Sequence, residues 1–318
     1  MKKLFSCQSY LLFYLPMPPK HLLSVLDVKE ELFDILALAK KLKIKHAQHV
    51  PHELTKGKVL GLLFEKPSTR TRVSFEVAMT HLGGTALYLS SKDLQLGRGE
   101  TIGDTAKVLS RYVDGLVYRA LDHKMVVELA RNATIPVING LDNLEHPCQA
   151  LADIFTIHEK KNKFASLKLA YIGDGNNVCN SLLLGCAIVG MNITAACPNG
   201  YEPNSEIFKA AESIAKSNIE LTNQPECAAK GADVIYTDVW ISMGMEEEQK
   251  EREKIFLRYQ VNSKLVKLAK KNCIIMHCLP AHRGMEITDD VIDSNKSVVF
   301  DQAENRLHVQ KAILAMML

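Results

Sequence analysis

The chain has 318 residues, of which 47% are hydrophobic, so it is long enough for two domains with sizeable cores. Its 39 lysines and arginines nearly balance its 36 aspartates and glutamates, and the basic residues are spread along the sequence. This distribution disfavours a nucleic-acid-binding protein. The eight cysteines form no CxxC pair and no zinc-like spacing with histidine, which favours a reduced, cytoplasmic protein.

The first twenty residues combine two lysines with a short apolar run, loosely as a signal peptide does. Polar residues at 6–9 interrupt the run, no small-residue cleavage site follows it, and it is too short to cross a bilayer. We therefore expect residues 1–19 to be an N-terminal extension that is disordered, or translation to start at Met17, which would leave residues 1–16 untranslated. No membrane partner is expected.

From about residue 20 the sequence alternates predicted helices and strands in two successive series, separated by polar residues at 160–166. In the first series, helices are predicted at 28–44, 71–84, 101–113, 124–133 and 146–162. Its strands are predicted at 58–64, 85–90, 115–120 and 135–140. The second comprises strands at 167–173, 192–198, 232–240 and 273–280 and helices at 177–190, 204–217, 262–272 and 305–318. The pattern predicts an α/β fold with two domains, each a parallel sheet flanked by helices.

The stretch PSTRTR, residues 67–72, directly follows the apolar run VLGLLF of a predicted buried strand. In open parallel sheets, ligands bind beyond the carboxyl ends of the strands. Ser68 is suited to be a helix N-cap, with Thr69, Arg70 and Thr71 in the first turn. Backbone N–H groups, hydroxyls and a guanidinium at such a position suit an oxyanion. An ordinary capped helix with surface arginines is the alternative, but the position after a buried strand favours a phosphate site.

Two further strand ends add hydrogen-bond donors. Arg119 ends a predicted strand, and His146, followed by Pro147, opens the helix that carries Gln149 one turn further in. A single histidine of this kind is more often structural than catalytic, yet these groups would converge with the Ser68 turn on one crevice. Donors without a nearby carboxylate suit an anion or a developing oxyanion better than a metal ion.

The segment GDGNN, residues 173–177, follows a strand and precedes a helix, as a dinucleotide-binding loop does. However, Val178 occupies the position of the third glycine, and the next strand ends without an acidic residue for a ribose. An NAD-dependent oxidoreductase is therefore disfavoured. We interpret Asn176 as a plain turn residue and expect Asn177 to present its amide at the helix start.

The segment TDVWISMG places Asp238 at a strand end, where its carboxylate is a natural counter-charge for a substrate ammonium. The residues that follow predict a mobile loop with a glycine hinge, although a solvated charged helix would also explain 246–254. Cys278 ends another strand, but no paired His–Asp order accompanies it, and His277 is adjacent rather than facing. We therefore expect no covalent catalysis.

The motifs STRTR, HPCQ, DVWISMG, HCLPAH and FDQAENR together resemble the aspartate/ornithine carbamoyltransferase family, in that family's order and over almost all of residues 20–318. STRTR and HPxQ are shared by the aspartate and ornithine enzymes, whereas SMG together with HCLP is typical of the ornithine enzymes. The resemblance implies that carbamoyl phosphate and L-ornithine give L-citrulline and phosphate, in arginine metabolism. A reactive acyl phosphate needs no cofactor and no metal, so we expect direct attack by a neutral amine with electrostatic stabilisation of the oxyanion.

The resemblance also implies a domain division and an assembly. Residues 20–150 would bind carbamoyl phosphate, residues 151–300 would bind ornithine, and residues 301–318 would form a C-terminal helix that packs back on the first domain. The family forms a homotrimer or a multiple of trimers, with sites at subunit boundaries. The two small-molecule substrates, and neither nucleic acid nor membrane, are the partners expected besides other copies of the chain.

The family's site residues map onto the matching motifs of this sequence. The residues implied to bind carbamoyl phosphate are Ser68, Thr69, Arg70, Thr71, Gln95, Arg119, His146, Gln149, Cys278, Leu279 and Arg306. Gln95 corresponds to a residue that, in related enzymes, completes the phosphate site of a neighbouring subunit. The residues implied to bind ornithine are Asn177, Asp238, Ser242 and Met243. Catalytic roles are implied for Thr71, Arg119, His146 and Cys278.

Two rival interpretations remain to be weighed. Another acceptor amine, such as putrescine or an acylated ornithine, is disfavoured by Asp238 with SMG, since an α-amino group requires that carboxylate. A catalytically silent binding or regulatory subunit would have lost Arg70, Arg119 or His146, and all three are present. The sequence leaves open whether the reaction serves arginine synthesis or breakdown, and how it is regulated.

Overall fold

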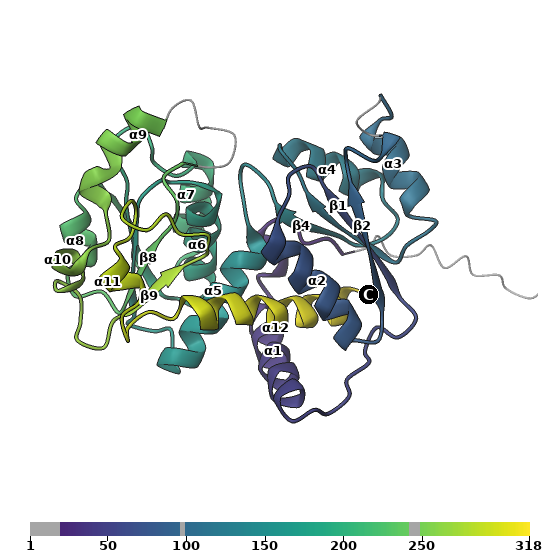
Figure 1. The fold of residues 1–318 in the computed structure, drawn as a ribbon, viewed down its shortest axis with the longest axis horizontal. Helices are drawn as coiled ribbons and strands as arrows, with labels where there is room; N and C mark the ends of the chain where they lie inside the picture. The colour runs from purple at the N-terminus through teal and green to yellow at the C-terminus, as the bar shows by residue number, and fades with distance from the viewer. Residues whose placement is uncertain (1–19, 96–98, 242–248) are drawn as a thin grey trace, which may run out of the picture.

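The structure is a computed structural model that describes residues 20–95, 99–241 and 249–318. It contains two parallel sheets, each flanked by helices, which lie side by side along the long axis of the molecule (Figure 1). The predicted α/β fold of two domains is therefore confirmed. The extension at 1–19 lies outside the described residues, as do Ser242 and Met243.

The first sheet has the strand order β2-β1-β3-β4, and all neighbouring strands are parallel. Its strands are β1 (Val59–Phe64), β2 (Thr85–Ser90), β3 (Gly115–Arg119) and β4 (Val137–Leu141). On β1, Leu60 and Leu62 join a core with α1 (Leu32–Ala47) and α2 (Thr69–His81). Leu63, on the opposite face, joins a core with α3 (Ile102–Leu109) and α4 (His123–Asn132). Because helices cover both faces, the strand is an unbroken apolar run.

The second sheet has the order β7-β6-β5-β8-β9 and is also parallel throughout. Its strands are β5 (Lys168–Ile172), β6 (Asn192–Ala196), β7 (Ile219–Thr222), β8 (Val234–Thr237) and β9 (Ile274–His277). Leu169 and Tyr171 of β5 face α6 (Asn177–Val189) and α7 (Ser205–Ile214). Ala170 and Ile172 join a separate core with α8 (Pro225–Ala229), α10 (Ser263–Val266) and α11 (Asp289–Ile292).

Two helices connect the halves of the molecule: α5 (Pro147–Lys161) and α12 (Val299–Met317). Helix α12 leaves the second sheet near β9 and runs across to the first, where it packs against α1, α2 and α5 (Figure 1). The largest cluster of buried hydrophobic residues continues across both sheets through these helices, with Ile154, Val309 and Ile313 among its members. The predicted return of the C-terminal helix to the first domain is therefore confirmed.

Some elements differ from the sequence prediction. Strand β7 was missed because it is an edge strand in which only Ile219 is buried, and α8 and α11 were missed because five and four residues are too few for a periodic signal. The helix expected at 262–272 contracts to α10, and α12 begins at Val299 rather than at 305. None of the helices in the described ranges is long and apolar enough to span a membrane.

Candidate active site

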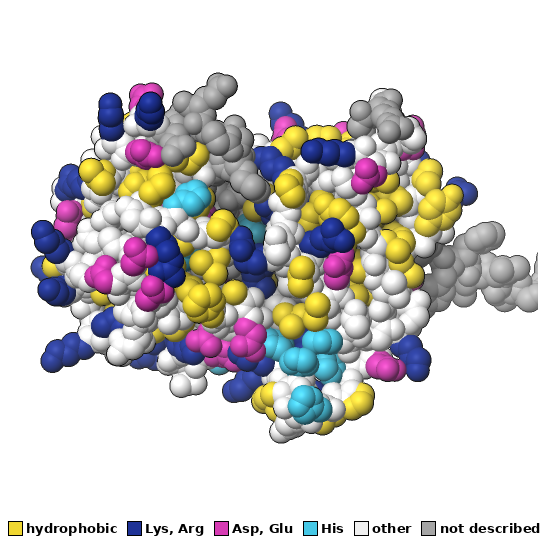
Figure 2. Space-filling model, in the orientation of Figure 1, with side chains coloured by type: hydrophobic (Ala, Val, Ile, Leu, Met, Phe, Trp, Pro, Cys, Tyr) yellow, Lys and Arg dark blue, Asp and Glu magenta, His cyan; other side chains and the backbone are white. Residues whose placement is uncertain are grey.

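A cavity of about 440 Å³ lies where the carboxyl ends of the two sheets face each other. Its walls come from residues at or after the ends of β3, β4, β5, β8 and β9, from the N-termini of α2, α5 and α6, and from α12. Basic side chains lie along the groove between the two halves on the face shown in Figure 2. This is the place where open parallel sheets bind their ligands.

The N-terminus of α2 forms one corner of the cavity. Ser68 is the N-cap, as predicted, and its hydroxyl accepts a hydrogen bond from the Thr71 backbone N–H at 3.3 Å. Ser68, Arg70 and Thr71 line the cavity, whereas the Thr69 side chain does not. Backbone N–H groups and side-chain donors of one helical turn are thus gathered at one point, as a bound oxyanion requires.

Two residues near this corner face elsewhere. Arg72 places its Nε 3.0 Å from Glu76 Oε1, and its guanidinium lies 3.8 Å from the centre of the Tyr88 ring. The two arginines of the motif therefore have different surroundings, as their spacing on a helix predicts. Gln95 is exposed and does not line the cavity. Its implied role concerns a neighbouring subunit, which a single chain does not test.

Three arginines, Arg70, Arg119 and Arg306, line the cavity on the side of the first sheet. Arg119 is 6% exposed and Arg306 is 3% exposed, and Arg306 Nη2 donates a hydrogen bond to Thr71 Oγ1 at 2.9 Å. Burial, followed by the positive charges of Arg306 and Arg70, lowers the pKa of Arg119 to about 10. Cations gathered and desolvated in this way favour the binding of an anion with several oxygens.

His146 precedes Pro147 at the start of α5 and is almost fully buried. Burial, with the charges of Arg306 and Arg119, lowers the pKa of His146 well below its usual range, so the ring is neutral at physiological pH. The His146 backbone N–H donates to Ser181 Oγ at 2.9 Å, and ring atom Nδ1 has no partner among the described residues. A neutral imidazole here can donate one hydrogen bond to a carbonyl oxygen.

Gln149 lies one turn into α5, and its side-chain NH₂ donates to Asp153 Oδ1 at 2.8 Å. Leu279 follows β9 with a φ of 60°, a left-handed conformation that is uncommon for leucine. Gln149, Cys278 and Leu279 all line the cavity together with the arginines. Sequence analysis identified these three residues, but not Asp153, because its carboxylate lies behind the cavity wall rather than in it.

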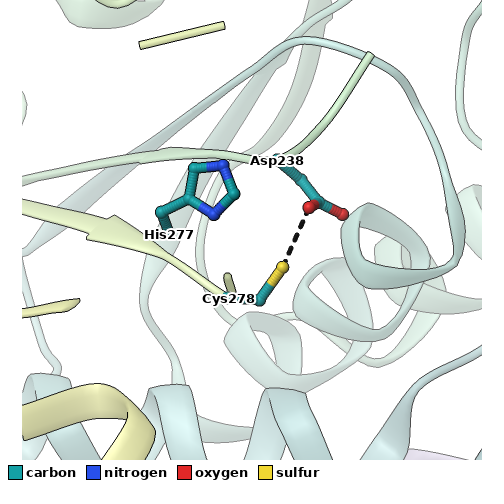
Figure 3. Close-up of side chains that lie close together, drawn as sticks. All are labelled: Asp238, His277 and Cys278. Carbon is teal, nitrogen blue, oxygen red and sulfur yellow. Dashed lines mark hydrogen bonds between the residues drawn. The ribbon is translucent and has the colours of Figure 1, made fainter. Parts of the chain in front are cut away.

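The opposite wall is built around Asp238, at the end of β8. Asp238 is 6% exposed, and its Oδ1 accepts hydrogen bonds from the Cys278 thiol at 2.9 Å and from the Val239 backbone N–H at 2.8 Å (Figure 3). Burial, and then the charge of Asp238, raises the pKa of Cys278 well above its usual range. The thiol therefore stays protonated, which supports the expectation that Cys278 is not a nucleophile.

The start of α6 completes this wall, and it requires a correction. Asn176, interpreted from the sequence as a plain turn residue, is the N-cap of α6 and donates from Nδ2 to Asp238 Oδ2 at 2.8 Å. That interpretation is wrong, because the side chain both caps the helix and orients the carboxylate. Asn177 lines the cavity as expected, and its amide donates to the backbone carbonyl of Asp142.

Sequence analysis also missed an ion pair between Asp174 and Arg252, both of which line the cavity. Arg252 belongs to α9 (Gln249–Phe256), inside the charged run that was interpreted as a loop or a solvated helix, yet it is 5% exposed. Its Nε donates to the Trp240 carbonyl at 2.7 Å, and its guanidinium lies 4.7 Å from the centre of the Tyr201 ring. The signal available in the sequence was that Asp174 follows a strand.

Asp238, His277 and Cys278 have potential ligand atoms within 4.8 Å of one another (Figure 3). The ring nitrogens of His277 are already engaged: Nδ1 accepts from the Leu279 backbone N–H at 2.9 Å, and Nε2 lies 3.0 Å from Glu286 Oε1. A metal ion would have to break one of these contacts and deprotonate the thiol. The three residues are therefore not arranged as a metal centre.

Comparisons with known proteins point in one direction. The model "Aspartate/ornithine carbamoyltransferase, carbamoyl-P binding domain" matches residues 20–159, and "Aspartate/ornithine carbamoyltransferase, Asp/Orn binding domain" matches residues 165–317. The chain is similar to "Ornithine carbamoyltransferase, catabolic" of Thermoplasma volcanium, with 57% identity over 94% of this chain and 98% of the relative. It is similar to "Ornithine carbamoyltransferase, anabolic" of Pyrococcus furiosus, with 58% identity over 91% of this chain and 93% of the relative.

Solved structures give the same picture. The ornithine carbamoyltransferase of Pyrococcus furiosus superposes with a TM-score of 0.92 at 57% identity, covering 94% of this chain and 97% of that one. The enzyme of Thermus thermophilus superposes with a TM-score of 0.86 at 44% identity, covering 95% of this chain and all of that one.

Proposed function

The chain belongs to the aspartate/ornithine carbamoyltransferase family, and we propose how its cavity carries out the transfer. Its activity is that of an ornithine carbamoyltransferase, converting carbamoyl phosphate and L-ornithine into L-citrulline and phosphate. The observation that best supports the mechanism is the pairing of three guanidiniums on one side of the cavity with the Asp238 carboxylate on the other.

Carbamoyl phosphate binds at the first-sheet side of the cavity in this proposal. The phosphate lies in the Ser68–Thr71 turn, where backbone N–H groups, including that of Thr69, and the Arg70 guanidinium meet its oxygens. Arg119 and Arg306 add positive charge from β3 and α12. Gln95 is proposed to complete this site on a neighbouring subunit.

The chemical step needs a neutral amine and a polarised carbonyl. The side-chain amine of ornithine, like that of lysine, has an unperturbed pKa of about 10.4, and desolvation beside cationic groups favours its neutral form. Its nitrogen lone pair attacks the carbonyl carbon, and Arg119, His146 and Thr71 hold the oxyanion. The C–O bond to phosphate then breaks with its electron pair, and the departing phosphate accepts the proton that the amine gives up.

Ornithine binds at the second-sheet side. Its α-ammonium is placed at Asp238, which Asn176 holds at 2.8 Å. Its carboxylate is placed at Asn177, whose NH₂ group has a second hydrogen besides the one donated to Asp142. Ser242 and Met243 are proposed as further ornithine ligands on the family pattern. Cys278 acts as a neutral thiol between the two substrates, since a thiolate beside Asp238 would be unfavourable.

The proposal includes the domain division and the assembly expected from the family. Residues 20–150 form the carbamoyl phosphate domain, 151–300 the ornithine domain, and 301–318 the returning helix, with the first boundary lying inside α5. We infer a homotrimer or a multiple of trimers, and a cytoplasmic protein, the latter because the seven described cysteines are all free thiols.

The test is a colorimetric assay for carbamoylated product with purified protein that starts at Met17. The protein receives carbamoyl phosphate and, in separate reactions, ornithine, putrescine, N-acetylornithine and aspartate. Turnover with ornithine alone is expected. Turnover with another amine would keep the phosphate site and overturn the role of Asp238, and folded protein without turnover on any amine would indicate a silent member of the family.

A further inference from the structure

Asp153 is a fully buried carboxylate that does not line the cavity and has no part in the mechanism above. It lies on α5, one turn after Gln149, and accepts three hydrogen bonds from side chains. Gln149 Nε2 and Gln302 Nε2 each donate to its Oδ1 at 2.8 Å, and the Tyr236 hydroxyl donates to its Oδ2 at 2.9 Å. Burying a carboxylate is costly, so three converging donors indicate a specific arrangement rather than simple packing.

The bond to Asp153 determines which way the Gln149 amide is turned. An oxygen of a carboxylate accepts hydrogen bonds, so Gln149 must direct its NH₂ toward Asp153 and its Oε1 away. Gln149 is 1% exposed, and its Oε1 has no partner in the part of the chain that the structure describes. Gln149 lines the same cavity as Arg70, Arg119 and Arg306, so its unpaired oxygen belongs to the lining of a cavity that is otherwise rich in donors.

Such an acceptor recognises an N–H group. The phosphate and the carbonyl oxygen of carbamoyl phosphate are served by donors, and only its NH₂ group requires an acceptor. An acyl phosphate with a methyl group in place of the NH₂ would leave the buried Gln149 oxygen unpaired, at a cost in binding. The orientation of one amide therefore distinguishes carbamoyl phosphate from other acyl phosphates.

We propose that Asp153 is a positioning residue, which fixes the Gln149 amide with Oε1 toward the carbamoyl NH₂ and thereby sets the preference for carbamoyl phosphate. This inference rests on the proposed function of the cavity. Asp153 itself contacts no substrate.

The partners of Asp153 also tie the acceptor to the second sheet. Tyr236 lies on β8, and Gln302 lies on α12 and accepts a hydrogen bond from the His277 backbone N–H of β9 at 3.0 Å through its Oε1. Cys278 follows directly on His277, so the end of β9 and the Gln149 acceptor share one buried set of hydrogen bonds. Asp153 thus fixes the position of the Gln149 oxygen relative to the second-sheet side of the cavity, where the amine is proposed to bind.

The decisive variant is Asp153→Leu, which is close to aspartate in shape but removes both acceptor oxygens. Asparagine would not serve, because its oxygen could remain at the position that Gln149 and Gln302 share while its NH₂ turned to the Tyr236 hydroxyl. The Gln149 NH₂ group then has no acceptor on this side in Asp153→Leu, so nothing holds the amide with its Oε1 toward the cavity. The KM for carbamoyl phosphate should rise roughly 10- to 100-fold, the range for an unpaired buried hydrogen-bonding group. The inhibition constant of acetyl phosphate, used as a competitive probe, should change less than about 3-fold, since its methyl group needs no acceptor.

A double-mutant cycle separates positioning from a merely structural role. In a Gln149→Met background, Asp153→Leu should cost less than about 2-fold in kcat/KM, because the group through which it acts is gone. Thr156→Val is the matched control: Thr156 is equally buried on α5 and accepts from Asn305 Nδ2 of α12 at 3.0 Å, but it does not reach Gln149. It should leave the ratio of the two acyl phosphate affinities unchanged.

Several outcomes would overturn the inference. Equal losses for carbamoyl and acetyl phosphate, or additive losses in the cycle, would mean that Asp153 only stabilises the fold. If Asp153→Leu does not fold, Gln149→Met decides. An unchanged ratio of the two acyl phosphate affinities in that variant would mean that Gln149 does not select the substrate, so Asp153 could not act through it. Wild-type turnover with ornithine is measured first, so failure of the proposed function is recognised separately.

Discussion

The two sheets present opposite chemistry to the cavity between them. The side of the first sheet contributes Arg70 and Arg119, joined by Arg306 of α12, whereas the side of the second sheet contributes Asp238 and the paired Asp174. The first side suits a phosphate dianion, and the second suits an ammonium group. In the proposed mechanism, each sheet edge therefore serves one reactant, and the transfer takes place where the two kinds of surface meet.

The two sides of the cavity do not correspond to two separate parts of the sequence. Arg306 comes after every strand of the second sheet, yet its guanidinium donates to Thr71 on α2. Helix α12 therefore carries a cation back to the first sheet. Helix α12 thus belongs to the first side of the cavity, although it follows the second sheet in the sequence.

The largest loss of activity is expected when the first side loses a guanidinium. Arg70→Met should lower kcat/KM for carbamoyl phosphate roughly 100- to 1,000-fold, because it removes a donor from the developing negative charge. Arg72→Met is the matched control on the same helical turn and should stay within about 3-fold, since the exposed Arg72 pairs with the partly buried Glu76 outside the cavity. Steady-state kinetics measures both, and equal losses would point to helix stability instead of charge in the cavity.

The second side is tested by Asp238→Asn. Removing the buried charge should raise the KM for ornithine roughly 100-fold, because the substrate ammonium loses its counter-charge. Binding of carbamoyl phosphate, measured by calorimetry without ornithine, should change less than about 3-fold. A comparable loss in carbamoyl phosphate binding would contradict the inference that each side of the cavity binds one substrate.

A smaller effect is expected at the point where the sides meet. Cys278→Ser should reduce kcat less than about 10-fold, because the raised pKa of the thiol leaves it protonated and serine retains a donor for Asp238. Turnover over a range of pH checks this expectation. A loss as large as that of Arg70→Met would instead indicate covalent participation of the thiol.

A third region, away from the cavity between the sheets, also holds buried positive charge. Where α1, α2 and α12 meet, Lys311 is fully buried, and its Nζ lies 3.2 Å from His52 Nε2. Figure 2 shows histidines grouped at the lower edge of the molecule, over this junction. Burial, and in addition the charge of Lys311, lowers the pKa of His46, His81 and His308. Here the burial of a positive charge lowers the stability of the fold, because no substrate anion is proposed to bind there and offset it.

Lys311→Met should therefore raise the free energy of unfolding near neutral pH by about 1 kcal/mol. The three histidines have folded-state pKa values below 6.5, so their contribution to stability is present above pH 6.5 and is lost as the pH falls below it. This loss should be smaller in the variant, because one cation is gone. Thermal unfolding at about pH 7.5 and about pH 5.5 measures it, with Lys41→Met, an exposed lysine of α1, as the control.

The sequence predicted the first side of the cavity well because its signals are local. The Ser68 N-cap, the first turn of α2 and His146 with Gln149 each occupy a few adjacent positions after a strand. The pair of Asp174 with Arg252 joins positions far apart in sequence, and so does the set of bonds around Asp153. Contacts of that kind depend on how two helices and a sheet pack together, and the hydrophobic periodicity of the sequence does not predict that packing.

The path of α12 also bears on how the protein is made. Val309, Ile313 and Leu314 of α12 belong to the same core as the apolar residues of α1 and α2. A ribosome adds about 5–20 residues per second, so roughly 10 to 30 s pass between completion of β4 and the start of α12. For that interval the first-made half of the protein exposes the surface that α12 later covers. The nascent chain is then a natural client for chaperones, and the first domain completes its core only after the second has been synthesised.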